Sequence, residues 1–191
     1  MTLEQIAGAA HYLPGRVNIG VLLGETLRLW DLELEILPLP GHSIGQIGVL
    51  TEDAAFLGDA LVAPEILTRY PIQYCYDVLA HRETLARLAL LQKAWYVGAH
   101  FNPTPDLEGL LAANRRNLER TADAVLEALA SPASTEAVVA AVAAALGVPP
   151  MDPAAYMLNS AVIKAHLSAH VREARLTFEV RDHRPVWCRQ T

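Results

Sequence analysis

The stretch Leu39-Pro40-Gly41-His42-Ser43-Ile44-Gly45-Gln46-Ile47-Gly48-Val49-Leu50 decides the fold, together with Phe56-Leu57-Gly58-Asp59-Ala60 shortly after it. Each segment places a metal-ligating residue, His42 or Asp59, beside glycine at a predicted strand end. Glycine allows the backbone to turn sharply next to such a side chain. Because imidazole and carboxylate are both suitable zinc ligands, this pattern indicates a metal site on a β scaffold.

Composition and charge narrow the class of protein. The chain has 191 residues, of which 52% are hydrophobic, and a net charge of -6. It can bury a core, and its charge argues against a general nucleic-acid coat. Cys75 and Cys188 are expected to be free thiols in a reducing compartment. We see no leader pattern and no apolar run of the roughly 18 residues that span a bilayer, so we expect no membrane contact and a cytoplasmic location.

The first part of the chain alternates polar and apolar residues, which is typical of half-buried strands. The pattern predicts strands over 17–23, 26–30 and 32–39, followed by a hairpin formed by 47–51 and 54–57. His42 and Asp59 then fall at strand ends.

The apolar period changes after this region to that of amphipathic helices. It predicts helices over 79–93 and 107–129, with the polar side chains of the second helix, Asn114 among them, on its solvent face. Between the two helices, a short strand over 94–97 runs into Gly98-Ala99-His100. A helix that leads into a strand ending on a histidine is an α/β unit, so we expect a mixed α/β (α+β) fold.

The last part of the chain predicts helices over 135–146 and 160–173, then a hairpin of 176–180 with 186–189. Ser134 or Thr135 is the expected cap of the first helix, and Gly147 its terminator. Helix, helix and hairpin is the order of a small winged helix, so we divide the chain into domains 1–130 and 131–191. The second domain carries six basic and five acidic residues. A DNA-binding face is usually more basic, so packing or dimerisation is the expected role of this module.

Three motifs suggest a family. Pro40-Gly41-His42-Ser43-Ile44-Gly45-Gln46-Ile47-Gly48, Phe56-Leu57-Gly58-Asp59-Ala60 and Val97-Gly98-Ala99-His100 resemble, in order, the third, fourth and fifth motifs of the metallo-β-lactamase superfamily. The resemblance covers about residues 32–102. It implies an αββα sandwich, here partial, that binds one or two metal ions, usually zinc, at one edge of its sheets. It also implies that His42 is a ligand of the first metal, Asp59 the bridging carboxylate, and His100 a ligand of the second.

The sequence departs from this family in one motif. His-x-His-x-Asp-His, which supplies two ligands to each metal in the family, is absent, because no two of the seven histidines stand two positions apart. The sequence before His42 is also short for the first half of the fold. His42, Asp59 and His100 suffice for one mononuclear site if they converge, with zinc as the expected ion and iron or manganese as alternatives.

The expected function is therefore metal-dependent hydrolysis at an incomplete or mononuclear site. In that mechanism metal-bound hydroxide attacks an ester, thioester, lactone or phosphodiester. A shortened sandwich exposes sheet edge and core, which predicts a homo-oligomer.

Two alternatives stay open. One is a catalytically inactive family member that acts in assembly or nucleic-acid contact. The other is a serine esterase, because Gly41-His42-Ser43-Ile44-Gly45 matches the Gly-x-Ser-x-Gly nucleophile elbow, with Ser43 as nucleophile.

The other histidines show weaker patterns. His166 and His170 stand four positions apart, a spacing that can hold zinc, but they lack the glutamate of His-Glu-x-x-His. We expect them to be surface or packing residues. His11, His81 and His183 have no partner pattern and are expected in solvent.

Overall fold

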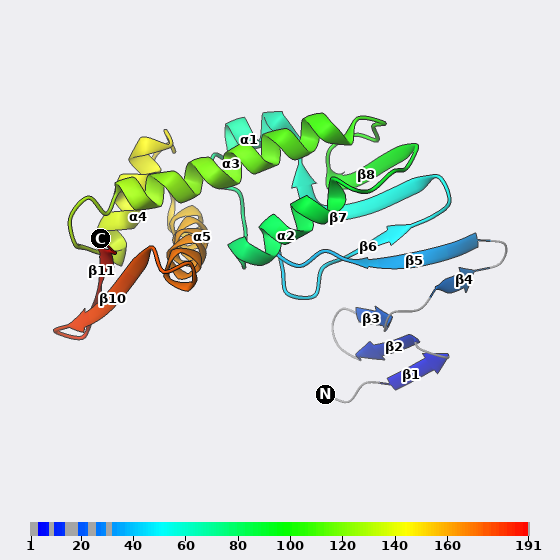
Figure 1. Cartoon of the computed structure of the whole chain (residues 1–191), viewed down its shortest axis with the longest axis horizontal. Coiled ribbons are helices and arrows are strands. Elements are labelled where there is room, and N and C mark those ends of the chain that lie inside the picture. The colour runs from blue at the N-terminus through cyan, green and yellow to red at the C-terminus, as the bar shows by residue number, and fades with distance from the viewer. Residues whose placement is uncertain (1–3, 8–9, 14–18, 23–25, 30–31, 191) are drawn as a thin grey trace.

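A computed structural model gives the architecture of the chain. The structure describes residues 4–7, 10–13, 19–22, 26–29 and 32–190, so parts of the predicted strands 17–23 and 26–30 lie outside the described residues. Figure 1 shows strands and helices mixed along the chain, which confirms the α+β class expected from the sequence. No helix among the described residues is long and apolar enough to cross a bilayer.

The main sheet has five strands. In spatial order they are β4 (Leu27–Leu29), β5 (Leu32–Pro38), β6 (Ile47–Leu50), β7 (Ala54–Val62) and β8 (Trp95–His100). The first four strands are antiparallel neighbours, whereas β8 joins β7 in parallel. The predicted strand over 32–39 and the hairpin of β6 with β7 are therefore confirmed.

Strand β7 is longer than the sequence indicated, which changes the position of Asp59. The strand continues past residue 57 to Val62, so Asp59 lies inside it and the prediction of a strand end is wrong. The pairing of β7 with β8 shifts register at Gly58, which has a φ of +54°. A bulge of this kind bends a strand and re-aims the side chains beside it. Asp59 is the residue that follows.

Helices cover one face of this sheet. They are α1 (Pro64–Arg69), α2 (Val78–Leu88) and α3 (Leu107–Glu127), and both α2 and α3 contact β7. Ala55 and Leu57 of β7 are fully buried, as expected for residues that face helices. The neighbouring Phe56 is 45% exposed and Trp95 of β8 is 50% exposed, so the described residues leave much of the opposite face open.

Helix α2 ends earlier than predicted. It stops at Leu88, because the Tyr96 hydroxyl accepts a hydrogen bond from the backbone of Lys93 and donates one to that of Leu91, which fixes this segment as a turn.

The C-terminal elements are β9 (Ala133–Ser134), α4 (Thr135–Ala145), α5 (Pro153–Arg172), β10 (Leu176–Arg181) and β11 (Arg184–Arg189). Their sheet has the order β10-β11-β9, so the predicted hairpin gains a third strand. Ser134 caps α4 and Gly147, with a φ of +70°, follows its end, as predicted. Helix α5 begins at Pro153 and not at residue 160, because Asp152 caps it and proline is tolerated at the first helical position.

Helix α3 connects the two parts of the chain. Its N-terminal end lies over the main sheet and its C-terminal end beside α4 and α5 (Figure 1). One buried cluster includes Leu57 and Leu85 from the first part together with Val139 and Ile163 from the second. At the other end of the chain, β1 (Glu4–Ala7), β2 (Ala10–Leu13) and β3 (Ile19–Leu22) form a separate antiparallel sheet.

Candidate metal site

His42 lies in the loop over residues 39–46, called here the His42 loop, which joins β5 to β6. The backbone of Leu39 donates a hydrogen bond to the carbonyl of Gln46 at 2.8 Å and closes the loop. Gly41 has a φ of +136°, and a Cβ built on it would stand 2.5 Å from Cα of His81. Only glycine fits so close to the backbone of α2.

The segment before and within α2 holds the His42 loop in place. The carbonyl of Gly41 accepts hydrogen bonds from the backbone of Tyr76 at 2.8 Å and of Asp77 at 3.0 Å. The hydroxyl of Thr84 donates to the carbonyl of Pro40 at 2.6 Å. The position of His42 is therefore fixed by groups that are distant in sequence, which the motif alone did not reveal.

His100 and Asp59 lie on the neighbouring strands β8 and β7, and α3 fixes the end of β7. The carbonyl of His100 accepts from the backbone of Ala63 at 3.0 Å. The side chain of Asn114 accepts a hydrogen bond from the backbone N–H of Val62 at 3.1 Å and donates one to its carbonyl at 2.9 Å. Asn114 is fully buried, so the prediction that it lies on the solvent face of its helix is wrong.

The structure brings the three predicted ligands together around the carboxylate of Asp59. Its Oδ1 lies 3.1 Å from Nε2 of His100, and its Oδ2 lies 4.0 Å from Nε2 of His42. The side chain of Asp59 is 38% exposed, that of His100 is 53% exposed and that of His42 is 26% exposed, so the cluster is open to solvent. Tyr74 packs edge-on against the His42 ring, with 4.9 Å between the ring centroids.

The types of donor in this cluster suit zinc, but their arrangement does not complete a site. Zinc bonds of about 2.0–2.1 Å separate neighbouring ligand atoms by roughly 3.4 Å in a tetrahedron. The two imidazoles lie at different oxygens of the Asp59 carboxylate, His100 at Oδ1 and His42 at Oδ2. Within the described ranges, no group of three or more histidine, cysteine, aspartate or glutamate side chains is placed to hold one ion. Further ligands are needed.

Ser43 does not lie on a nucleophile elbow. The elbow needs a helix directly after the serine. In the structure Ser43 is followed by turn residues and then by strand β6, and its side chain is exposed. The structural requirement of the serine-esterase alternative is therefore not met.

Three histidines outside the cluster are buried, one on α2 and two on α5, and His170 of α5 contacts the carbonyl of Ala122 on α3 at 2.9 Å. His81, His166 and His170 are each 1% exposed, so the expectation that His81 lies in solvent is wrong. Burial lowers the pKa of His81 to about 4, with a smaller contribution from His42. Burial also lowers the pKa of His166 to about 3, helped by the nearby His170, Arg82 and His81. These imidazoles are neutral at pH 7.

The other predicted residues lie away from the cluster. His183 is exposed in the β10–β11 turn, as expected, and the side chain of His11 lies outside the described part of the chain. Cys75 and Cys188 are free. Burial raises the pKa of the Cys75 thiol to about 12, so it is unreactive.

Comparisons with known proteins identify the fold. No protein-family profile and no curated protein matches this chain. Among solved structures, a metallo-β-lactamase family protein from Thermus thermophilus is similar with a TM-score of 0.69 and 20% identity, over 93% of this chain and 56% of that one. A β-lactamase domain protein from Burkholderia ambifaria is similar with a TM-score of 0.68 and 17% identity, over 89% of this chain and 52% of that one.

The similarity to these two structures agrees with the α+β class of the chain. It is a metallo-β-lactamase-fold protein that spans about half the length of the two structures it matches. At such identities the fold is established, and the chemistry has to be argued from the site.

Proposed function

We propose that this chain is a metal-dependent hydrolase whose His42, Asp59 and His100 supply part of the metal-binding site. The observation that carries the proposal is the position of Asp59, with one carboxylate oxygen directed at each imidazole. Three side chains from a loop and two strands meet there, and they are of the types that bind zinc. Their exposure leaves room for a further ligand and for a substrate.

The proposed substrate has a polarisable carbonyl or phosphoryl group: an ester, a thioester, a lactone or a phosphodiester. Zinc is the proposed ion, with iron or manganese as alternatives that imidazole and carboxylate also bind.

The remaining ligands come from outside this cluster in our proposal. A second copy of the chain is one source, because exposed apolar side chains such as Phe56 and Trp95 on the open sheet face favour association. The elements after residue 130 are proposed to be a winged-helix-like module that serves packing or dimerisation.

The test is hydrolysis by the purified full chain with and without added zinc, iron or manganese. We expect metal-dependent turnover that is lost in Asp59→Asn and kept in Ser43→Ala, which serves as the matched control in the same loop as His42. Turnover that survives Asp59→Asn, or that needs no metal, would contradict the proposal.

A catalytically inactive protein is the second candidate. It is favoured by the lack of any three-residue metal group within the described ranges. If metal binds at Asp59 but none of the four substrate classes is hydrolysed, this candidate replaces the first.

A further inference from the structure

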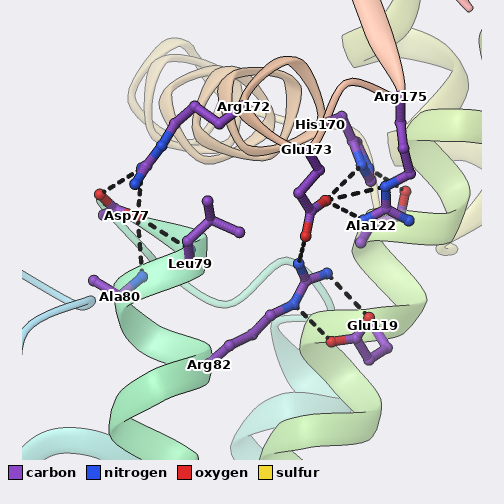
Figure 2. A network of polar contacts seen from close by, with 10 residues as sticks. All are labelled: Asp77, Leu79, Ala80, Arg82, Glu119, Ala122, His170, Arg172, Glu173 and Arg175. Atoms are coloured by element: carbon purple, nitrogen blue, oxygen red, sulfur yellow. Dashed lines mark hydrogen bonds and ion pairs between the residues drawn. The ribbon is translucent and has the colours of Figure 1, made fainter. Parts of the chain in front are cut away.

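The C-terminal helix α5 is tied to the start of α2 by an ion pair. Nη1 of Arg172 donates hydrogen bonds to Oδ2 of Asp77 at 2.9 Å and to Oδ1 at 3.2 Å. Figure 2 shows this pair on one side of the junction and the pairs of Arg82 with Glu173 and Glu119 on the other. Arg172 is 54% exposed and Asp77 33%, so solvent weakens the attraction between them.

Asp77 is also the residue through which α2 contacts the His42 loop. Its Oδ1 accepts hydrogen bonds from the backbone of Leu79 at 3.0 Å and Ala80 at 3.1 Å, which caps the helix. Its own backbone N–H donates to the carbonyl of Gly41, the residue before His42. The cap hydrogen bonds, with Arg172 beside them, hold the pKa of the Asp77 carboxyl below its usual value against the effect of burial. One residue therefore joins the helix cap, the ion pair and the loop.

The end of α5 contacts α2 a second time, because its C-cap residue Glu173 accepts a hydrogen bond from Nη1 of Arg82 at 2.6 Å. His81, the residue before Arg82, is buried on α2. His81 in turn lies directly beneath Gly41, whose missing side chain would overlap its backbone. The loop thus rests on a part of α2 that α5 contacts at two points.

From these contacts we infer that Arg172 is a positioning residue for His42, acting through the Asp77 cap and the Gly41 carbonyl. The C-terminal module then helps to hold the His42 loop of the site in position. This inference concerns the position of the loop, so it stands or falls independently of metal binding and hydrolysis.

Three variants separate the ion pair from the cap. Arg172→Ala removes the partner of Asp77. Asp77→Asn keeps an oxygen that can cap the helix but loses the negative charge. Arg172→Lys keeps a positive charge at the same place. Arg181→Ala is the matched control, because Arg181 also pairs with a carboxylate, that of Glu179, but on the exposed strand β10.

The measurement is amide hydrogen exchange and amide chemical shifts in the metal-free full chain. In Arg172→Ala we expect exchange of the Tyr76 and Asp77 amides, which donate to Gly41, to rise roughly two- to fivefold. The signals of Gly41 and His42 should shift in the same variant and in Asp77→Asn. Arg172→Lys should restore them in part, and Arg181→Ala should leave them unchanged.

Two results would overturn the inference. One is unchanged exchange and unchanged His42-loop signals in Arg172→Ala. The other is an equal change in Arg181→Ala, which would mean that a general loss of stability moves the loop. Should Arg172→Ala fail to fold, the comparison of Asp77→Asn with Arg172→Lys provides the same test.

Discussion

Asn114 of α3 holds both backbone polar groups of Val62, the last residue of β7, with hydrogen bonds of 3.1 Å and 2.9 Å. Val62 is paired in register with His100, and Asn114 is fully buried. One carboxamide in a helix therefore fixes the end of β7 beside the strand that carries His100. This link makes the integrity of the candidate site depend on α3.

We expect Asn114→Ala to lower the free energy of unfolding by about 2–4 kcal/mol, because it leaves the buried N–H and carbonyl of Val62 without partners. Chemical denaturation measures this change. Arg116→Ala, at an exposed position of the same helix, should change stability by no more than about 0.5 kcal/mol. Equal effects of the two variants would contradict the role given to Asn114.

Gly41→Ala should destabilise the protein by about 2–4 kcal/mol. The added methyl group would overlap the backbone of His81, and the φ of +136° is unfavourable for alanine. Gly45→Ala is the control in the same loop, because a Cβ built there meets no atom within 4 Å. Thermal denaturation of both variants should show a large loss only for Gly41→Ala, and a tolerated alanine at that position would show that the loop does not rest on α2.

The buried histidines predict a loss of stability in acid. His81 and His166 have folded-state pKa values of about 4 and about 3, below the ordinary 6.5. The unfolded chain therefore binds protons that the folded chain excludes. Their contribution is complete above pH 6.5 and is lost as the pH falls from 6.5 toward 4 and 3. The total effect is on the order of several kcal/mol.

Denaturation curves measured between pH 7 and pH 4 test this prediction. Burial opposes protonation of His166, and the neighbouring His170, Arg82 and His81 oppose it further. His166→Leu should flatten the dependence by about 1 kcal/mol per pH unit. His183→Asn, at an exposed turn, should leave the slope as it is. An unaltered slope in His166→Leu would contradict the burial of that imidazole.

The sequence predicted the main sheet and the order of the C-terminal elements because both depend on local patterns. The alternation of polar and apolar residues predicted β5, β6 and the start of β7, and the cap at Ser134 predicted the start of α4. The extension of β7 to Val62 was missed, since the bulge at Gly58 interrupts the pattern just before Asp59. The start of α5 was missed because proline usually interrupts a helix, although it also fits the first helical turn, where Pro153 stands.

The contacts that hold the site in place could not be predicted, because they depend on packing between segments that are distant in sequence. Asn114 has the polarity of a surface residue, and only the fold brings it to Val62, 52 positions away. His81 was expected in solvent for the same reason, yet α5 and the His42 loop cover it. The one signal available for Asn114 was a polar residue inside an amphipathic helix. Sequence alone does not show whether such a residue is buried or exposed.

Zinc binding to the metal-free full chain, measured by equilibrium dialysis, tests the central claim most directly. We expect saturable binding that is weaker than a complete structural site, with a Kd above about 1 μM, because the described ligands are incomplete. Asp59→Asn, His42→Ala and His100→Ala should each abolish it, and His183→Asn should not. Binding that persists in Asp59→Asn, or no saturable binding in the unaltered chain, would contradict the assignment of His42, Asp59 and His100 as metal ligands.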